Sequence, residues 1–142
     1  MVLYAKDILA KDFLSFSRST SVLEAVRAMK ETRHGFAIVG SPESPEGIVT
    51  EWDVVSKVVA EGRDPAKTSL AEVMTSELLM VQANQGIAAV AKVMSEKGVR
   101  RMLVKDGDKV IGYITEKTVL ANLEDYVDKV SAQISRLQAP WF

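Results

Sequence analysis

The sequence contains no cysteine and one histidine, His34, among its 142 residues. Without cysteine there is no disulfide, no thiolate zinc or iron–sulfur site and no thiol nucleophile. The glycine-rich phosphate-binding signatures G-x-G-x-x-G and G-x-x-x-x-G-K-[ST] are absent as well. Because no nucleophile and base set stands out either, the sequence argues against an enzyme and predicts neither a metal site nor a catalytic cofactor.

An excess of charge is also missing, since 18 Lys and Arg face 19 Asp and Glu, a formal net charge of −1. This balance supplies no broad positive field for nucleic acid and no basic face for an anionic membrane. No apolar run reaches the roughly 18 residues of a membrane span, and the N-terminal residues lack the apolar core of a signal peptide. The sequence therefore predicts a cytoplasmic protein and disfavours both membrane and nucleic-acid binding.

The sequence does contain an internal duplication. Residues 47–53, GIVTEWD, recur 65 positions later as GYITEKT at 112–118, and the same offset pairs Met29 with Met94 without gaps. A period this long lies outside the roughly 20 to 50 residues of solenoid repeats. It predicts two copies of a small domain that face each other about a pseudo-twofold axis.

Each copy has the apolar pattern of strand, helix, strand, strand and helix. Apolar residues at i, i+3, i+4 and i+7 start at Val22 and again at Ile87, which predicts two core-facing helices. Ser21 is the predicted cap of the first helix and Asn84 that of the second. The fold class is therefore α/β (α+β), with tandem β-α-β-β-α repeats and an additional C-terminal helix.

The predicted C-terminal helix has a heptad pattern. Its apolar positions alternate in steps of three and four: Leu120, Leu123, Val127, Val130, Ile134 and Leu137. Two interpretations stay open, a helix that lies on the chain's own surface and a seam for self-association. Trp141 and Phe142, which follow Pro140, would dock on a neighbour or remain disordered. We place the first copy at 1–65, the second at 66–124 and the C-terminal helix and tail at 125–142.

Duplicated copies of this order, with G-h-x-T-x-x-D at the last strand-to-helix turn of the first, resemble the CBS domain pair, also called a Bateman module, in its stand-alone form. The resemblance covers nearly the whole chain. It implies a disc-like pair with two clefts between the copies. In this family such clefts commonly bind adenosine-containing ligands, among them AMP, ADP, ATP and S-adenosylmethionine, and the modules often dimerise.

Thr50 and Asp53 are the central candidate residues. A Thr hydroxyl at the first turn of a helix suits a phosphate, and a carboxylate three residues later can accept hydrogen bonds from both hydroxyls of a ribose. The same spacing also makes a capping box, a purely structural device, but the repeat favours the ligand interpretation. Because Thr118 replaces the carboxylate in the second copy, one cleft is predicted to be the better nucleotide site.

The resemblance adds further residues to the better cleft. It implies an adenine slot that includes Ile48, Glu77, Leu78 and Leu79. It also implies that Arg100 and Arg101 of the opposite copy lie near the phosphates, with ordinary solvated arginines as the alternative.

The residues of the weaker second cleft would be His34, Phe13, Leu14 and Thr115. A lone histidine near a helix end is more often a partner of the helix dipole than a ligand. Trp52 is predicted to pack on its helix rather than stack on a base.

These observations predict a regulatory ligand-binding module, a homodimer that senses AMP or another adenine nucleotide and changes its interaction with an unidentified protein. S-adenosylmethionine or a dinucleotide is the alternative ligand, although the arginine pair favours phosphate over a sulfonium. A nucleic-acid-binding module and a purely structural dimerisation module are the alternatives from other classes.

Overall fold

The structure, a computed structural model, describes residues 3–138. Its elements in chain order are α1 (Ala5–Ile8), β1 (Leu14–Phe16), α2 (Val22–Thr32), β2 (Phe36–Ser41), β3 (Ser44–Thr50), α3 (Glu51–Val54), the π-helix η1 (Val55–Val59), α4 (Leu70–Val73), β4 (Met80–Gln82), α5 (Ile87–Lys97), β5 (Arg101–Asp106), β6 (Lys109–Thr115) and α6 (Glu116–Gln138). The predicted order of strand, helix, strand, strand and helix is confirmed in both copies.

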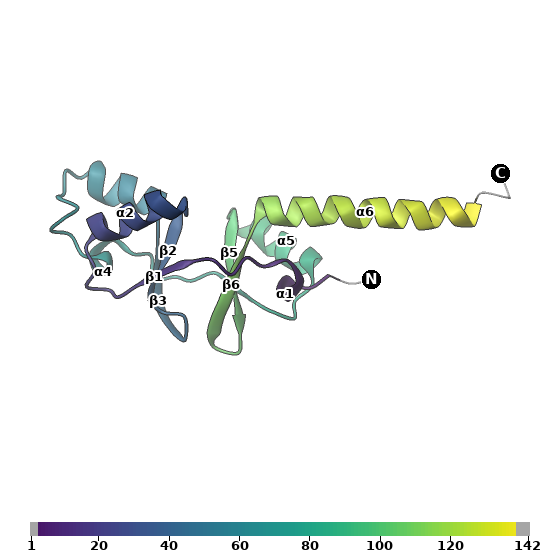
Figure 1. The fold of residues 1–142 in the computed structure, drawn as a ribbon, viewed down its shortest axis with the longest axis horizontal. Coiled ribbons are helices and arrows are strands. Elements are labelled where there is room, and N and C mark those ends of the chain that lie inside the picture. The colour runs from purple at the N-terminus through teal and green to yellow at the C-terminus, as the bar shows by residue number, and fades with distance from the viewer. Residues whose placement is uncertain (1–2, 139–142) are drawn as a thin grey trace.

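The strands form two three-stranded sheets, β1-β2-β3 and β4-β5-β6. In each sheet the first pair is parallel and the second antiparallel, and the register shifts at the same place in the repeat, after Val39 and after Val104. Figure 1 shows the two sheets side by side in the middle of the molecule, with α2 on one outer side and α5 on the other. The duplication in the sequence is thus a duplication of the fold.

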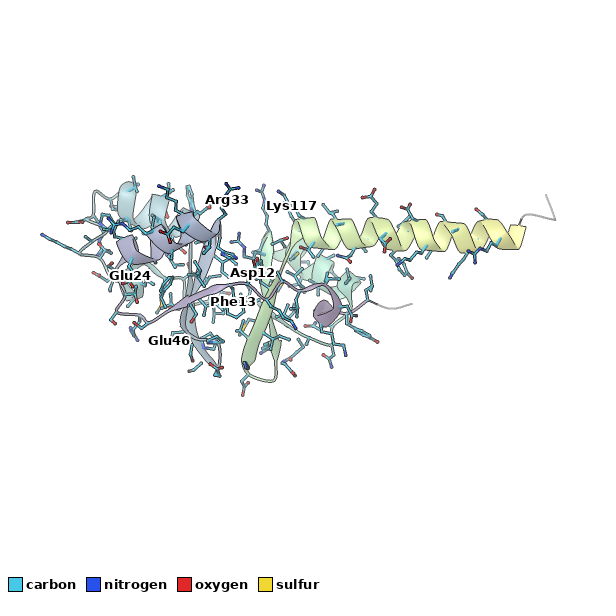
Figure 2. The ribbon with its side chains drawn as sticks, viewed as in Figure 1. Asp12, Phe13, Glu24, Arg33, Glu46 and Lys117 are labelled. Atoms are coloured by element: carbon cyan, nitrogen blue, oxygen red, sulfur yellow. The ribbon has the colours of Figure 1, made fainter. Side chains whose placement is uncertain are left out.

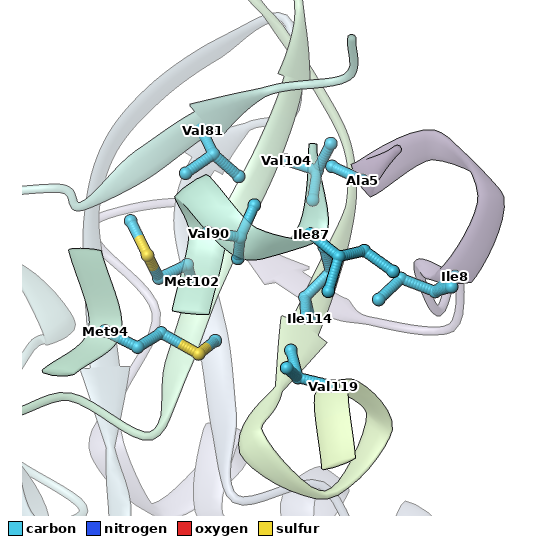
Figure 3. Packing of buried hydrophobic residues seen from close by; sticks show 10 residues of the cluster. All are labelled: Ala5, Ile8, Val81, Ile87, Val90, Met94, Met102, Val104, Ile114 and Val119. Carbon is cyan, nitrogen blue, oxygen red and sulfur yellow. The ribbon is translucent and has the colours of Figure 1, made fainter. Parts of the chain in front are cut away.

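The segment before the first strand of each copy packs on the opposite copy. Helix α1 places Ala5 and Ile8 in the core of the second copy, beside Ile87 and Ile114 (Figure 3). Helix α4 reciprocates, because its Leu70 and Val73 belong to the core of the first copy. Each of these helices removes apolar surface of the opposite copy from water, which stabilises that copy. Each copy therefore depends on a segment that belongs to the other.

A third apolar cluster joins the two sheets. Its buried members are Phe36, Ile38, Leu103 and Val110, and its partly buried members are Phe13, Ile48, Leu78, Met80 and Tyr113. Three pairs in this cluster are related by the repeat offset: Ile38 with Leu103, Phe13 with Leu78, and Ile48 with Tyr113. The two copies therefore contribute equivalent residues to the contact between the sheets.

The two predicted helix caps have different outcomes. Ser21 caps α2 as predicted, since its side chain accepts a hydrogen bond from the backbone N–H of Glu24. The prediction of Asn84 as the cap of α5 is wrong, because the N-cap is Gly86. A turn closed by the backbone N–H of Gln82 and the side chain of Gln85 delays the start of this helix.

Helix α6 is continuous from Glu116 to Gln138, so the last helix of the second copy and the C-terminal helix are one element. It extends well beyond the body of the molecule in Figure 1. Leu120, Val127 and Ile134 are 64%, 58% and 47% exposed, so the chain's own surface does not cover them. Trp141 and Phe142 lie outside the described residues. Within 3–138, no helix combines the length and the apolar character that crossing a membrane requires.

Candidate functional site

A cleft of about 550 Å³ lies between the two copies. It brings together seven of the eight residues predicted for the better site: Ile48, Thr50, Glu77, Leu78, Leu79, Arg100 and Arg101. Sequence reasoning missed other lining residues: Gly35, Glu51, Thr75, Gly98, Val99 and Leu103. Glu51 and Val99 adjoin the predicted Thr50 and Arg100 in the sequence, so adjacency could have found them. Gly35 and Leu103 carried no such signal, because they enter the cleft through the pairing of distant segments.

One wall of the cleft is the chain that crosses from α4 to β4. Thr75 on this segment pairs with Ile48 of β3 through two backbone hydrogen bonds of 2.9 and 2.8 Å. The glycine that opens the motif permits this approach, since a Cβ on Gly47 would lie 2.8 Å from Met74 Sδ and 2.9 Å from Thr75 O. The motif at residues 47–53 therefore places Thr50 at the cleft, and its glycine lets the segment with Thr75 approach β3 closely.

Asp53 lies behind the cleft and is not one of its lining residues. Its side chain is 6% exposed. One carboxylate oxygen accepts hydrogen bonds from the backbone N–H and the hydroxyl of Thr50 at 2.9 and 3.1 Å. The other accepts from the Thr75 hydroxyl at 3.1 Å and from Lys57 Nζ at 2.9 Å. The capping box is thus formed, and Asp53 reaches a ribose only by exchanging some of these partners.

Arg101 is a partly buried cation on the cleft wall. Its guanidinium carbon lies 4.7 Å from the ring centre of Phe36, and its Nε is buried without a hydrogen-bond partner. Gly35 leaves room for it, because a Cβ there would lie 3.1 Å from Arg101 Nη2. Burial lowers the pKa of Arg101, and the charges of Glu51 and Tyr113 oppose this shift. An anion in the cleft would add a second negative charge beside this guanidinium.

Two residues at the cleft are largely exposed. The side chain of Arg100 is 86% exposed, and its Nε lies 3.7 Å from Glu116 Oε1. Trp52 is 71% exposed and lines the cleft, so the prediction that it packs on its helix is wrong. Asp53 lies on the buried face of the short helix α3, so the side chain of the neighbouring Trp52 points to solvent.

Within residues 3–138, neither the first cleft nor the hollow that contains His34 brings together the residues predicted for the second cleft. His34 lines a different hollow, of about 440 Å³, together with residues of α2, α3 and η1 and without Phe13, Leu14 or Thr115. Thr115 caps α6, since its hydroxyl accepts a hydrogen bond from the backbone N–H of Thr118 at 3.3 Å.

His34 and Tyr113 meet at one carboxylate, that of Asp12. His34 Nε2 lies 3.2 Å from one oxygen of Asp12, and the Tyr113 hydroxyl donates to the other at 3.4 Å. Figure 2 shows Asp12 and Phe13 in the middle of the molecule, between the two sheets. Hydrogen bonds from its own backbone and from His34 lower the pKa of Asp12, whereas burial and then Asp12 raise the pKa of Tyr113. Asp12 and Tyr113 were not among the predicted residues. The repeat offset could have found them, because Asp12 corresponds to Glu77 and Tyr113 to Ile48.

The comparisons agree with the duplicated fold. The family model of the CBS domain matches residues 5–60 and again 70–125. The chain therefore belongs to the CBS domain family and is a tandem CBS pair.

Several proteins are similar over most of the chain. An uncharacterized protein of Methanopyrus kandleri is 30% identical over 125 residues, which cover 85% of this chain and 62% of that protein, less than two thirds of its length. Hypoxic response protein 1 of Mycobacterium tuberculosis is 28% identical over 123 residues, 86% of each chain. The hexameric CBS-CP12 protein from bloom-forming cyanobacteria superposes with a TM-score of 0.76 at 29% identity, over 99% of this chain and 90% of that one.

Proposed function

We propose that this CBS pair is a regulatory module that binds an adenine nucleotide in the 550 Å³ cleft. The observation that carries the proposal is Arg101, a partly buried cation on the cleft wall with an unpartnered Nε donor. A phosphate is the ligand group that best satisfies a guanidinium, because it offers both negative charge and several acceptors. Binding would then alter the contact of the module with a protein that it regulates.

The other parts of a nucleotide find matching chemistry in the same cleft. Ile48, Leu78 and Leu79 offer an apolar slot for the base. Asp53 would receive the ribose hydroxyls by releasing Thr75, with which it shares a hydrogen bond of 3.1 Å. Occupancy of the cleft would therefore loosen the segment that crosses between the two copies, which is a route from binding to a change of shape.

S-adenosylmethionine is the second candidate ligand. The carboxylates of Glu51 and Glu77 also line the cleft, and they favour a positively charged group. An adenine slot serves both ligands, so the balance between the arginines and these two carboxylates decides which one binds.

Thermal unfolding with AMP, ADP, ATP and S-adenosylmethionine tests the proposal. A ligand at about 100 times its dissociation constant adds roughly 2.7 kcal/mol, or about 5 to 10 °C at this chain length. Fluorescence of Trp52 locates the ligand in this cleft when Trp141, the other tryptophan, is replaced by Phe. If no adenine compound at millimolar concentration shifts the unfolding temperature, the proposal is wrong.

We also propose that the chain forms a homodimer through α6. Leu120, Val127 and Ile134 form its exposed stripe at heptad spacing, whereas Leu123 at an intervening position packs against the core of the second copy. Apolar residues repeated at heptad spacing are the pattern that packs one helix along another. The exposed apolar stripe of α6 has no cover within the described chain, so a second copy supplies the missing contact.

Charge placed in the stripe tests this seam. The double substitution Val127→Glu and Ile134→Glu should convert the dimer into a monomer in light scattering, because it buries like charges against each other. Ala132→Glu, on an exposed position of the same helix outside the stripe, is the matched control and should leave the dimer intact. A wild-type monomer, or a dimer that survives the double substitution, would exclude α6 as the seam.

A further inference from the structure

The two clefts have the same backbone frame. In the first, Ile48 and Thr75 pair through two backbone hydrogen bonds of 2.9 and 2.8 Å; in the second, Tyr113 and Ala10 pair through two of 2.9 Å. Since these residue pairs are related by the repeat offset, this backbone contact is common to the two clefts, while their side chains differ.

Side chains with rings replace aliphatic or cationic ones at four positions of the second cleft. Four residues that line the first cleft are Ile48, Leu78, Val99 and Arg101. Their equivalents at the repeat offset are Tyr113, Phe13, His34 and Phe36. The exchange adds bulk at each of the four positions. It also removes the buried arginine, but Arg33 and Lys117, the equivalents of Gly98 and Trp52, bring other cations. The second cleft therefore loses space rather than positive charge.

Tyr113 is held in this place from two sides. Its ring packs edge-on against Phe36, with ring centres 4.9 Å apart and an angle of 74° between the planes. Its hydroxyl donates to Asp12 Oδ1 at 3.4 Å, and the other oxygen of Asp12 lies 3.2 Å from His34 Nε2. The three polar residues come from the segment before β1, the turn after α2 and strand β6, so the contact ties both copies and the crossing segment together.

We propose that Tyr113 closes the second cleft as a built-in occupant, positioned by Asp12 and His34, and that the chain consequently offers one ligand site. This deepens the proposed function by setting its stoichiometry. The closure itself depends only on side chains of this chain, so it can be tested without any nucleotide.

The absence of cysteine permits a direct measurement of access to each cleft. Leu79 lines the first cleft, and Leu14 is its equivalent beside the second. Leu79→Cys should react quickly with a chromogenic disulfide reagent, and Leu14→Cys at least about tenfold more slowly. Adding Tyr113→Ile, the residue found at the equivalent position of the first copy, should raise the rate of Leu14→Cys to within about threefold of Leu79→Cys. The rate of Leu79→Cys itself should not change.

Tyr113→Phe separates the ring from its hydroxyl, and it should keep the cleft closed if the ring fills the space. Circular dichroism of each variant establishes that it is folded, and Tyr113→Phe supplies the comparison should Tyr113→Ile unfold. Equal labelling rates for the two wild-type-background cysteines would overturn the proposal, as would a rate for Leu14→Cys that Tyr113→Ile leaves unchanged.

A titration with AMP adds a second arm, in which one site per wild-type chain is expected and two equal sites would also overturn the closure. If AMP does not bind at all, the proposed function fails, and the labelling rates still decide whether Tyr113 closes the second cleft.

Discussion

Replacing Arg101 with methionine should raise the stability of the free protein and weaken its ligand binding. An unpartnered buried donor costs about 1 to 3 kcal/mol, and methionine removes it while keeping an unbranched apolar stem. The substitution also loses the contact with the Phe36 ring, which contributes about 0.5 to 2 kcal/mol. The balance is a gain of about 1 kcal/mol, or roughly 3 to 5 °C in unfolding temperature for a chain of this size.

The same substitution removes the charge-assisted hydrogen bonds proposed for the phosphate. Their loss corresponds to about 1.5 to 3 kcal/mol, a weakening of about 10- to 150-fold in nucleotide affinity. Differential scanning calorimetry of the free protein and a binding titration give the two numbers. Arg100→Met is the matched control: this side chain is 86% exposed, so its stability should change by less than about 0.5 kcal/mol. If Arg101→Met destabilises the free protein by more than 1 kcal/mol and leaves affinity unchanged, Arg101 is a structural residue and the reasoning is refuted.

Three further substitutions test the frame around the cleft. Gly112→Ala would place a Cβ against the carbonyl oxygen of Ala10 and 2.7 Å from Leu9 Cδ1, so urea unfolding should show a loss of about 1 to 3 kcal/mol. Arg33 adopts the left-handed conformation, with φ of 60°, at the end of α2, where the second copy has Gly98. Relief of about 1 to 2 kcal/mol of strain, less the entropy cost of glycine, predicts that Arg33→Gly raises stability by about 0.5 to 1 kcal/mol. Asp53→Asn should lower stability by about 1 to 3 kcal/mol because it weakens a buried, fully bonded carboxylate, and an unchanged unfolding temperature would contradict that role.

The fold was predictable because local and repeated signals agree. Helical spacing from Val22 and from Ile87, together with one constant offset, was sufficient for the order of elements and for two equivalent copies. The packing of α1 and α4 on the opposite copies was not predictable. Each helix has only four residues, and its apolar residues do not indicate which copy it packs against. Such pairings are decided by which apolar surface remains uncovered once the sheets have formed.

Much of the cleft was predictable for the same reason, and the exceptions depend on distant contacts. Of the seven candidate residues that line one cleft, Thr50 follows from the motif, and the other six follow from the resemblance to the CBS pair. The closure of the second cleft rests on Asp12 and Tyr113, which lie 101 positions apart in the chain. The exposure of Trp52 follows from the inward turn of Asp53, a matter of helix phase that the motif alone did not reveal.

Isothermal titration calorimetry of AMP into the 142-residue chain tests the central claim most directly. The account predicts one binding site per chain and an affinity about 10- to 150-fold weaker in Arg101→Met, from the lost hydrogen bonds to the phosphate. Two equal sites per chain, or binding that Arg101→Met leaves unchanged, would contradict it.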